Sequence, residues 1–217
     1  MNANTQRLFV AGPAGQIECA VDLPPTSPTP AGRTSGALGT AVICHPHPQH
    51  GGTMDNKVVQ TLARAVLQLG WRSVRFNFRG IGASQGGWDD GVGEIDDAMA
   101  VIDAHREPNT SLLLAGFSFG GYVAAQAAMR LPEGAKAAQL VLVGPSTEKQ
   151  PMPAVPPETV VVHGEIDDVV PLSATLAWAR PQSLPVIVLP GVGHFFHGQL
   201  GLLKTVIVRE LLGRAAL

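Results

Sequence analysis

The sequence predicts an α/β protein whose core is a mainly parallel, twisted sheet with helices on both faces. Two patterns indicate this class. Segments with apolar residues at helical spacing alternate with short apolar runs, as in proteins with a parallel sheet. The runs are continuously apolar, as in strands covered on both faces, and they lie at 40–44, 112–115, 140–143, 159–162 and 186–189.

The predicted helices fit between these strands. Apolar residues recur at spacings of four, four and three over 58–69, and Gly70 follows as the C-cap. The same kind of periodicity predicts a second helix over 92–102 and a closing helix over 203–211. The segment 121–130 is rich in residues that favour helices.

The first 25 residues depart from this alternation. The segments 7–10 and 16–23 are separated by a Gly-Pro-Ala-Gly turn, which predicts a strand pair at an antiparallel edge. A further strand with alternating side chains is expected at 73–78. The stretches 24–39 and 145–157 are rich in Pro and are predicted loops. The second is too short for a large helical lid, so we expect a small, open active site.

Composition limits the classes of function. The 217 residues suit a single domain spanning 1–217. The net charge of -2 argues against nucleic acid or an anionic membrane as partner. A polar N-terminus and the lack of an apolar stretch of about 18 residues predict a cytoplasmic protein. The expected oligomeric state is a monomer or a homodimer. Cys19 and Cys44 lie in apolar surroundings and are expected to be buried thiols.

The pattern G-x-S-x-G occurs twice, around Ser84 and around Ser118. A nucleophilic serine in this motif needs a sharp turn between a strand and a helix, which exposes its hydroxyl. Ser118 lies between a buried strand and the predicted helix 121–130, whereas a glycine-rich loop follows Ser84. Ser118 is therefore the predicted nucleophile, with a helix N-cap as its alternative role. Ser84 is interpreted as a turn serine.

A serine hydroxyl needs a base to accept its proton, and the base needs an orienting acid. His194 follows the strand at 186–189 and a turn, which favours it over His197, expected on the next helix. The loop after the strand at 159–162 offers three carboxylates. Asp167 and Asp168 compete for the role of acid, and Glu165 is a third choice; the alternative for any of them is a solvated loop carboxylate or a helix cap.

These segments resemble the α/β-hydrolase family. Its chain order of nucleophile, acid and base is Ser, Asp, His, and GFSFGG at 116–121 is similar to its nucleophile elbow. HGEIDDVVP at 163–171 resembles its acid loop, and the alignment selects Asp167 over Asp168. Segments 45–59 and 75–82 resemble small lidless bacterial hydrolases, distantly similar to dienelactone hydrolases and dipeptidyl-peptidase-like esterases. The resemblance implies an α/β-hydrolase fold and a serine esterase without cofactor.

The resemblance also implies an oxyanion hole with two backbone donors. One is the amide of Phe119, directly after the nucleophile, and the other comes from the loop after the strand at 40–44. Pro46 and Pro48 have no N–H, so His47 is predicted, with Gln49 as the alternative. The predicted walls of the substrate pocket are aromatic residues that could equally be core packing, namely Trp88, Phe119, Tyr122, Phe195 and Phe196.

The sequence favours a serine carboxylesterase acting on small ester substrates through an acyl-enzyme. A metal enzyme is a rival because His45, His47 and His50 cluster, but prolines separate them and no standard ligand spacing occurs. A dinucleotide-binding oxidoreductase is disfavoured because the glycine pattern at 80–86 misses its third position and opens no helix. A catalytically silent interaction protein of the same fold is the main alternative.

Overall fold

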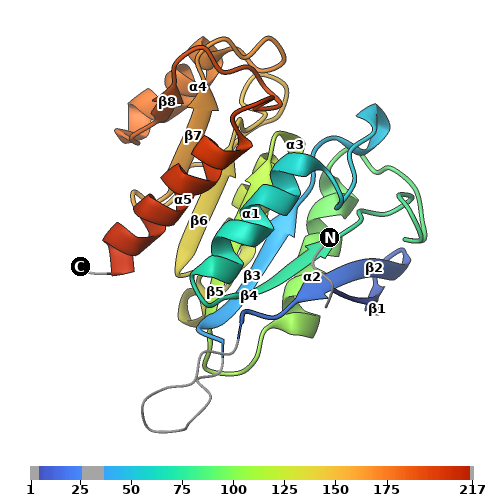
Figure 1. Ribbon diagram of the computed structural model, residues 1–217. Coiled ribbons are helices and arrows are strands. Elements are labelled where there is room, and N and C mark those ends of the chain that lie inside the picture. Colours follow the sequence, from blue (N-terminus) through green and yellow to red (C-terminus); the bar gives the residue numbers. More distant parts are fainter. Residues whose placement is uncertain (1–4, 26–36, 216–217) are drawn as a thin grey trace, which may run out of the picture.

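The computed structural model describes residues 5–25 and 37–215 (Figure 1). These residues form one eight-stranded sheet. Its strands are β1 (Gln6–Gly12), β2 (Gly15–Asp22), β3 (Gly39–Cys44), β4 (Arg72–Phe76), β5 (Ser111–Phe117), β6 (Gln139–Val143), β7 (Val160–Gly164) and β8 (Ile187–Leu189). Most of the predicted loop 24–39 lies outside the described residues.

The strand order is β1-β2-β4-β3-β5-β6-β7-β8. Strands β4, β3, β5, β6, β7 and β8 are parallel to their neighbours in this order. In contrast, β1 pairs antiparallel with β2, and β2 pairs antiparallel with β4. The predicted class is therefore confirmed, including the antiparallel N-terminal edge. The strand expected at 73–78 ends earlier, at Phe76, because the amide of Phe78 bonds to the ring of His45 instead of a neighbouring strand.

Five α-helices are described, and four match predicted segments. They are α1 (Lys57–Gln68), α2 (Val92–His105), α3 (Phe119–Arg130), α4 (Leu172–Ala179) and α5 (Leu200–Ala215). The side chain of Asn56 accepts a hydrogen bond from the amide of Val58 and so caps the start of α1. Gly70, with φ at 85°, lies just beyond the end of α1, as the sequence predicts. The sequence analysis missed α4.

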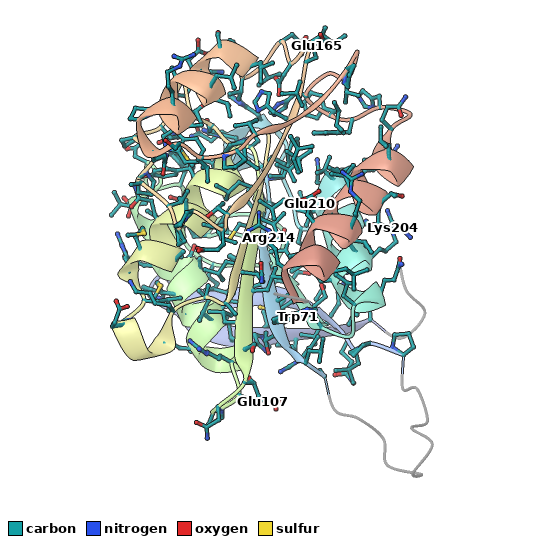
Figure 2. The ribbon with its side chains drawn as sticks, turned by 90° about the vertical axis from the view of Figure 1, so that its left-hand side faces the viewer. Trp71, Glu107, Glu165, Lys204, Glu210 and Arg214 are labelled. Carbon is teal, nitrogen blue, oxygen red and sulfur yellow. The ribbon has the colours of Figure 1, made fainter. Side chains whose placement is uncertain are left out.

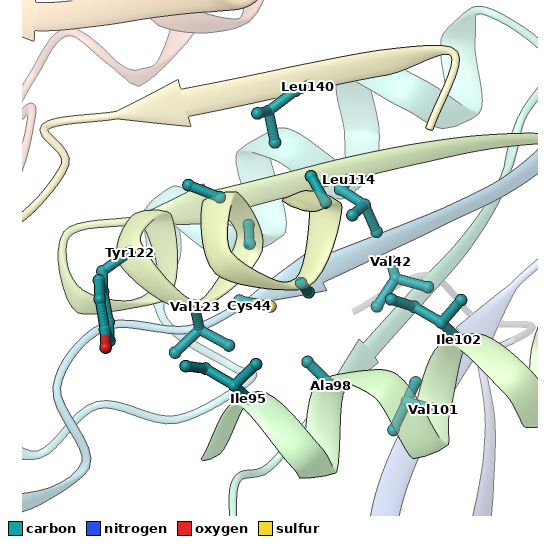
Figure 3. Close-up of a cluster of buried hydrophobic side chains, with 14 of the residues drawn as sticks. Val42, Cys44, Ile95, Ala98, Val101, Ile102, Leu114, Tyr122, Val123 and Leu140 are labelled. Carbon is teal, nitrogen blue, oxygen red and sulfur yellow. The ribbon is translucent and has the colours of Figure 1, made fainter. Parts of the chain in front are cut away.

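The helices cover both faces of the sheet. Side chains of α2 and α3 pack on one face, whereas those of α1 and α5 pack on the other. Figure 3 shows the first layer, where Ile95, Ala98 and Ile102 of α2 face Val42 and Val123. The core consists mostly of Val, Leu, Ile and Ala, in agreement with the low aromatic content. Both cysteines are free and buried, and burial raises the pKa of each thiol.

The parallel strands define two ends of the molecule. Figure 2 shows Glu107, which precedes β5, and Glu165, which follows β7, at opposite ends. In parallel sheets of this kind, the loops at the carboxyl ends of the strands carry the functional groups. At that end the turn after β4 is fixed to α2, because Arg79 makes a bidentate salt bridge to the buried carboxylate of Asp97. This edge of the sheet is where the predicted site residues lie.

Candidate active site

Ser118 occupies a sharp turn between β5 and α3. Its backbone has φ at 56° and ψ at -119°, which is unusual for a residue with a side chain. The turn is possible because glycines flank it. A Cβ atom at Gly116 would collide with the backbone of Gly120, and one at Gly120 would collide with the backbone of Cys44. This geometry is that of a nucleophile elbow.

The structure brings Ser118, His194 and Asp167 together. Ser118 Oγ lies 3.0 Å from Nε2 of His194, and Nδ1 of His194 lies 2.7 Å from Oδ2 of Asp167. An ionised carboxylate can only accept a hydrogen bond, so Nδ1 carries the proton and Nε2 is free to accept one from Ser118. Parallel strands supply these residues through the loops after β5, β7 and β8. The arrangement can activate a serine hydroxyl as a nucleophile.

The carboxylate of Asp167 is buried yet well supported by hydrogen bonds. Its Oδ1 accepts from the amides of Val169 and Val170, at 2.9 and 2.7 Å. Burial acts to raise the pKa of Asp167, but the hydrogen bonds from His194 and from these two amides outweigh it. The pKa of Asp167 is therefore below its ordinary value, and the group is ionised at neutral pH.

A second histidine, His163, lies on the far side of this carboxylate. Its Nε2 donates to the carbonyl of Val170 at 2.9 Å and lies 3.5 Å from Oδ2 of Asp167. Its Nδ1 accepts from Thr175 of α4, whose hydroxyl is paired with that of Thr147. Burial lowers the pKa of His163, so the ring is neutral. His163 thus fixes the acid loop from inside the fold, a role that the sequence analysis missed.

The competing carboxylates and the second histidine lie elsewhere. Asp168 and His197 are exposed, and neither contacts Ser118 or His194 in the described part of the chain. Glu165 accepts a hydrogen bond from the amide of Gly191 at 2.8 Å. This contact joins the loop that carries Asp167 to the loop that carries His194.

The hydroxyl of Ser84 is held by hydrogen bonds within a turn. Its hydroxyl donates to the carbonyl of Asn77 at 2.7 Å and accepts from the amide of Glu18 at 2.9 Å. The surrounding residues form a turn that the hydrogen bond from the amide of Gly80 to the carbonyl of Gln85 closes. Both bonding capacities of the hydroxyl are used, in agreement with its interpretation as a turn serine.

The predicted oxyanion donors, the amides of Phe119 and His47, lie on neighbouring segments. Phe119 is the first residue of α3, so its amide has no partner within the helix. The His47 amide has no backbone acceptor among the residues that the structure describes. The rings of His47 and Phe119 are 5.1 Å apart, and the glycine after Phe119 packs against the end of β3. The two amides therefore belong to adjacent segments beside Ser118.

His45 holds the loop that carries His47. The ring is fully buried and packs against Phe78 in a tilted arrangement, with the ring centroids 4.4 Å apart. Its Nε2 accepts from the amide of Phe78, and its Nδ1 donates to the carbonyl of Pro46. Burial lowers the pKa of His45 to about 4. The ring is therefore neutral and bonded on both sides, and within the described residues no group of three His, Cys, Asp or Glu could hold a metal ion.

A pocket of about 80 Å³ opens beside Ser118. Its walls come from the loop after β3, the start of α3, the acid loop and the loop 145–157. Its lining residues include His47, His50, Phe119, Ser146, Lys149 and Val170. The contribution of the loop 145–157 had no signal in the sequence, because nothing in that Pro-rich stretch marks which side chains turn inward.

Of the aromatic residues predicted as pocket walls, Phe119 lines this pocket, whereas Trp88, Tyr122, Phe195 and the buried Phe196 do not. The ring of Trp88 contacts that of His47 in a tilted arrangement, with the ring centroids 4.6 Å apart. Tyr122 is buried in the core beside Phe119. Phe195 is exposed and packs edge-on against the ring of His194 at 5.1 Å. No helix in the described residues is long and apolar enough to cross a membrane.

Comparison with known proteins agrees with the α/β fold and identifies the family of this chain. The family model described as serine aminopeptidase, S33, matches residues 39–185. An α/β serine hydrolase homologue from Coxiella burnetii is 41% identical, with a TM-score of 0.81, over 95% of this chain and 97% of that chain. A lidless α/β serine hydrolase from Xanthomonas campestris is 34% identical, with a TM-score of 0.83, over 97% of this chain and 95% of that chain.

A curated relative matches over a shorter range. An uncharacterized protein from Rickettsia prowazekii is 41% identical over 130 residues, which are 58% of this chain and 51% of that protein. The match thus spans about half the length of this relative. The family model and the two solved structures instead cover most of the chain described here. The chain therefore belongs to the serine aminopeptidase S33 family and is a member of the α/β serine hydrolases.

Proposed function

We propose that this protein is a carboxylesterase that cleaves small esters through Ser118, His194 and Asp167. The observation that carries the proposal is the position of His194, which bonds the Ser118 hydroxyl through one nitrogen and the Asp167 carboxylate through the other. The residues Asp168, Glu165 and His197 lack such an arrangement. A structural role alone would not require a strained backbone at Ser118.

The reaction would follow two steps. Ser118 Oγ attacks the ester carbonyl while its proton passes to Nε2 of His194, and Asp167 stabilises the imidazolium that forms. The amides of Phe119 and His47 would stabilise the oxyanion. The leaving alcohol then takes the proton from His194 and departs. In the second step, water gives a proton to His194 and attacks the acyl-enzyme, which releases the acid and restores Ser118.

The lining of the pocket favours an ester over an aminopeptidase substrate, although the family is described as serine aminopeptidase. An aminopeptidase binds the free ammonium group of its substrate, and a carboxylate is the usual partner for such a group. No Asp or Glu is among the described residues that line the pocket beside Ser118, whereas Lys149 is. A free amino group would therefore meet a charge of the same sign.

A fluorophosphonate probe tests the proposal directly, because it forms a covalent bond only with an activated serine. The wild-type protein and Ser84→Ala should be labelled, whereas Ser118→Ala should not. A panel of nitrophenyl esters should show turnover in the two labelled proteins, decreasing as the acyl chain lengthens. A folded wild-type protein that neither reacts with the probe nor cleaves any ester would favour the silent interaction protein instead.

A further inference from the structure

The pocket beside Ser118 contains a positive charge without a counter-ion. Lys149 lines this pocket together with His47 and His50. Within residues 5–25 and 37–215, Lys149 forms no ion pair, whereas most of the buried and half-buried arginines do. The neighbouring Glu148 is exposed and does not line the pocket. The charge of Lys149 is therefore available to a bound molecule.

The segment that carries Lys149 is held at both ends. On one side, the amide of Ser146 donates to the carbonyl of Ser118 at 3.2 Å, and the amide of Gln150 donates to the carbonyl of Ser146 at 3.0 Å. On the other side, Gln126 of α3 donates to the carbonyl of Pro151 at 3.1 Å. These bonds fix the backbone of Lys149 relative to the nucleophile, although its side chain is exposed.

The charge of Lys149 acts on the residues of the site. The pKa of His47 is lowered, first by burial and then by the positive charges of His50 and Lys149. The ring of His47 is in contact with Phe119, which directly follows the nucleophile. An ammonium group that affects His47 is close enough to interact with a substrate bound at Ser118.

We propose that Lys149 makes this site selective for esters that carry a carboxylate near the scissile bond. The inference depends on the proposed esterase function and adds a substrate class to it. A cation that lines a pocket without an internal partner attracts anions and repels ammonium groups. Because Lys149 is exposed, solvent and salt weaken this attraction, and we expect a preference of about 2- to 5-fold at low ionic strength.

Two pairs of substrates test the proposal, since the carboxylate could lie on either side of the ester. The first pair is the mono-4-nitrophenyl ester of adipic acid and 4-nitrophenyl hexanoate. The second is 4-acetoxybenzoate and phenyl acetate. The measured quantity is the ratio of kcat/KM for the anionic ester to kcat/KM for the neutral one. We compare wild type with Lys149→Met and Lys149→Glu, at low and at high salt.

Two variants serve as controls. Lys204→Met removes the same charge from α5, which Figure 2 shows well away from the end of the molecule marked by Glu165. Glu148→Gln changes the charge next to Lys149 without altering the pocket lining. Both should leave the ratio close to that of wild type. Lys149→Met should lower it about 2- to 5-fold in at least one pair, and Lys149→Glu should lower it further.

The outcomes separate this proposal from the esterase function. A ratio that stays the same in Lys149→Met for both pairs, or that decreases equally in Lys204→Met, would overturn the role of Lys149 while the esterase stands. A wild-type ratio that does not decrease at high salt would also contradict it. A wild-type protein that cleaves none of the four esters would overturn the proposed function and the selectivity with it.

Discussion

Glu165 Oε2 lies 2.8 Å from the backbone amide of Gly191. The first residue lies two positions before Asp167, and the second lies three positions before His194. The contact therefore connects the two loops whose side chains must meet within 2.7 Å. Glu165, one of the three carboxylates that the sequence offered as the acid, has a role in positioning rather than in the proton relay.

Removing this contact should reduce activity moderately. We expect Glu165→Ala to lower kcat/KM for 4-nitrophenyl acetate about 3- to 10-fold, because an exposed hydrogen bond contributes only about 1 kcal/mol to holding the loops. Glu165→Gln keeps an acceptor oxygen and should stay close to wild type. Equal losses in the two variants would show that the negative charge matters, not the hydrogen bond.

The choice of acid can be tested by a pair of adjacent substitutions. Asp167→Asn should lower kcat roughly 10³- to 10⁴-fold, because an amide at this position favours the wrong tautomer of the base. Asp168→Asn should be mild, since that side chain is exposed. Steady-state kinetics on one nitrophenyl ester distinguishes them. The reverse ranking would make Asp168 the acid.

The His47 amide can be removed with little change to the backbone. His47 has φ at -51°, which proline can adopt, so His47→Pro deletes the donor without forcing a new conformation. Turnover should decrease about 10²- to 10³-fold. His47→Ala keeps the amide but loses the ring, and it should retain most of the activity. If a folded His47→Pro protein matched His47→Ala in kcat, the second oxyanion donor would have to be another amide.

The contacts of His163 predict a loss of stability. His163→Leu would leave the buried carbonyl of Val170 without its partner, and the hydroxyl of Thr175 would keep only its bond to Thr147. The free energy of unfolding should decrease by about 1–3 kcal/mol, measured by urea denaturation. Thr175→Val removes only the outer donor and should cost less. A larger loss in Thr175→Val than in His163→Leu would show that the ring is not the centre of this network.

The buried His105 predicts how stability changes with pH. Burial, followed by the charge of Arg72, lowers its pKa to about 4 in the folded protein, from the ordinary 6.5 of the unfolded chain. Between these pH values the unfolded state binds more protons than the folded state. The contribution of the neutral His105 ring to stability is therefore complete above pH 6.5 and is lost as the pH decreases towards 4. His105→Asn keeps an acceptor for Arg72 and should show a shallower decrease between pH 7 and 5 in urea titrations. An unchanged slope would assign the effect to other groups.

The fold could be predicted largely from the sequence because apolar patterning reports burial. The continuous runs gave the parallel strands, and the helical periods gave α1, α2 and α5. The spacing of apolar residues did not predict α4. This helix is short and has exposed apolar side chains, so no polar face alternates with an apolar one at helical spacing. The strand predicted at 73–78 was too long. Phe78 fits the alternation of its side chains, but the amide of Phe78 donates to the ring of His45 instead.

The site was predictable where local geometry dictates residue type. Glycines on both sides of a strand–helix turn identify Ser118, and a loop position after a strand identifies His194. The pocket was not predictable in this way, because Ser146 and Lys149 come from a loop with no period, and their direction depends on tertiary contacts. Two of the aromatic residues expected as walls, Tyr122 and Phe196, pack in the core instead, since a buried ring gains more from close packing.

The strained backbone of Ser118 has a consequence for the natural variation of this protein. Glycine would adopt φ at 56° and ψ at -119° more easily than serine does, at a saving of about 1–3 kcal/mol. Random substitution would therefore find a more stable molecule at this position by discarding the hydroxyl. Selection for activity would then be needed to keep serine there, because a glycine variant would be more stable but inactive. Position 118 would thus show a trade-off between stability and activity.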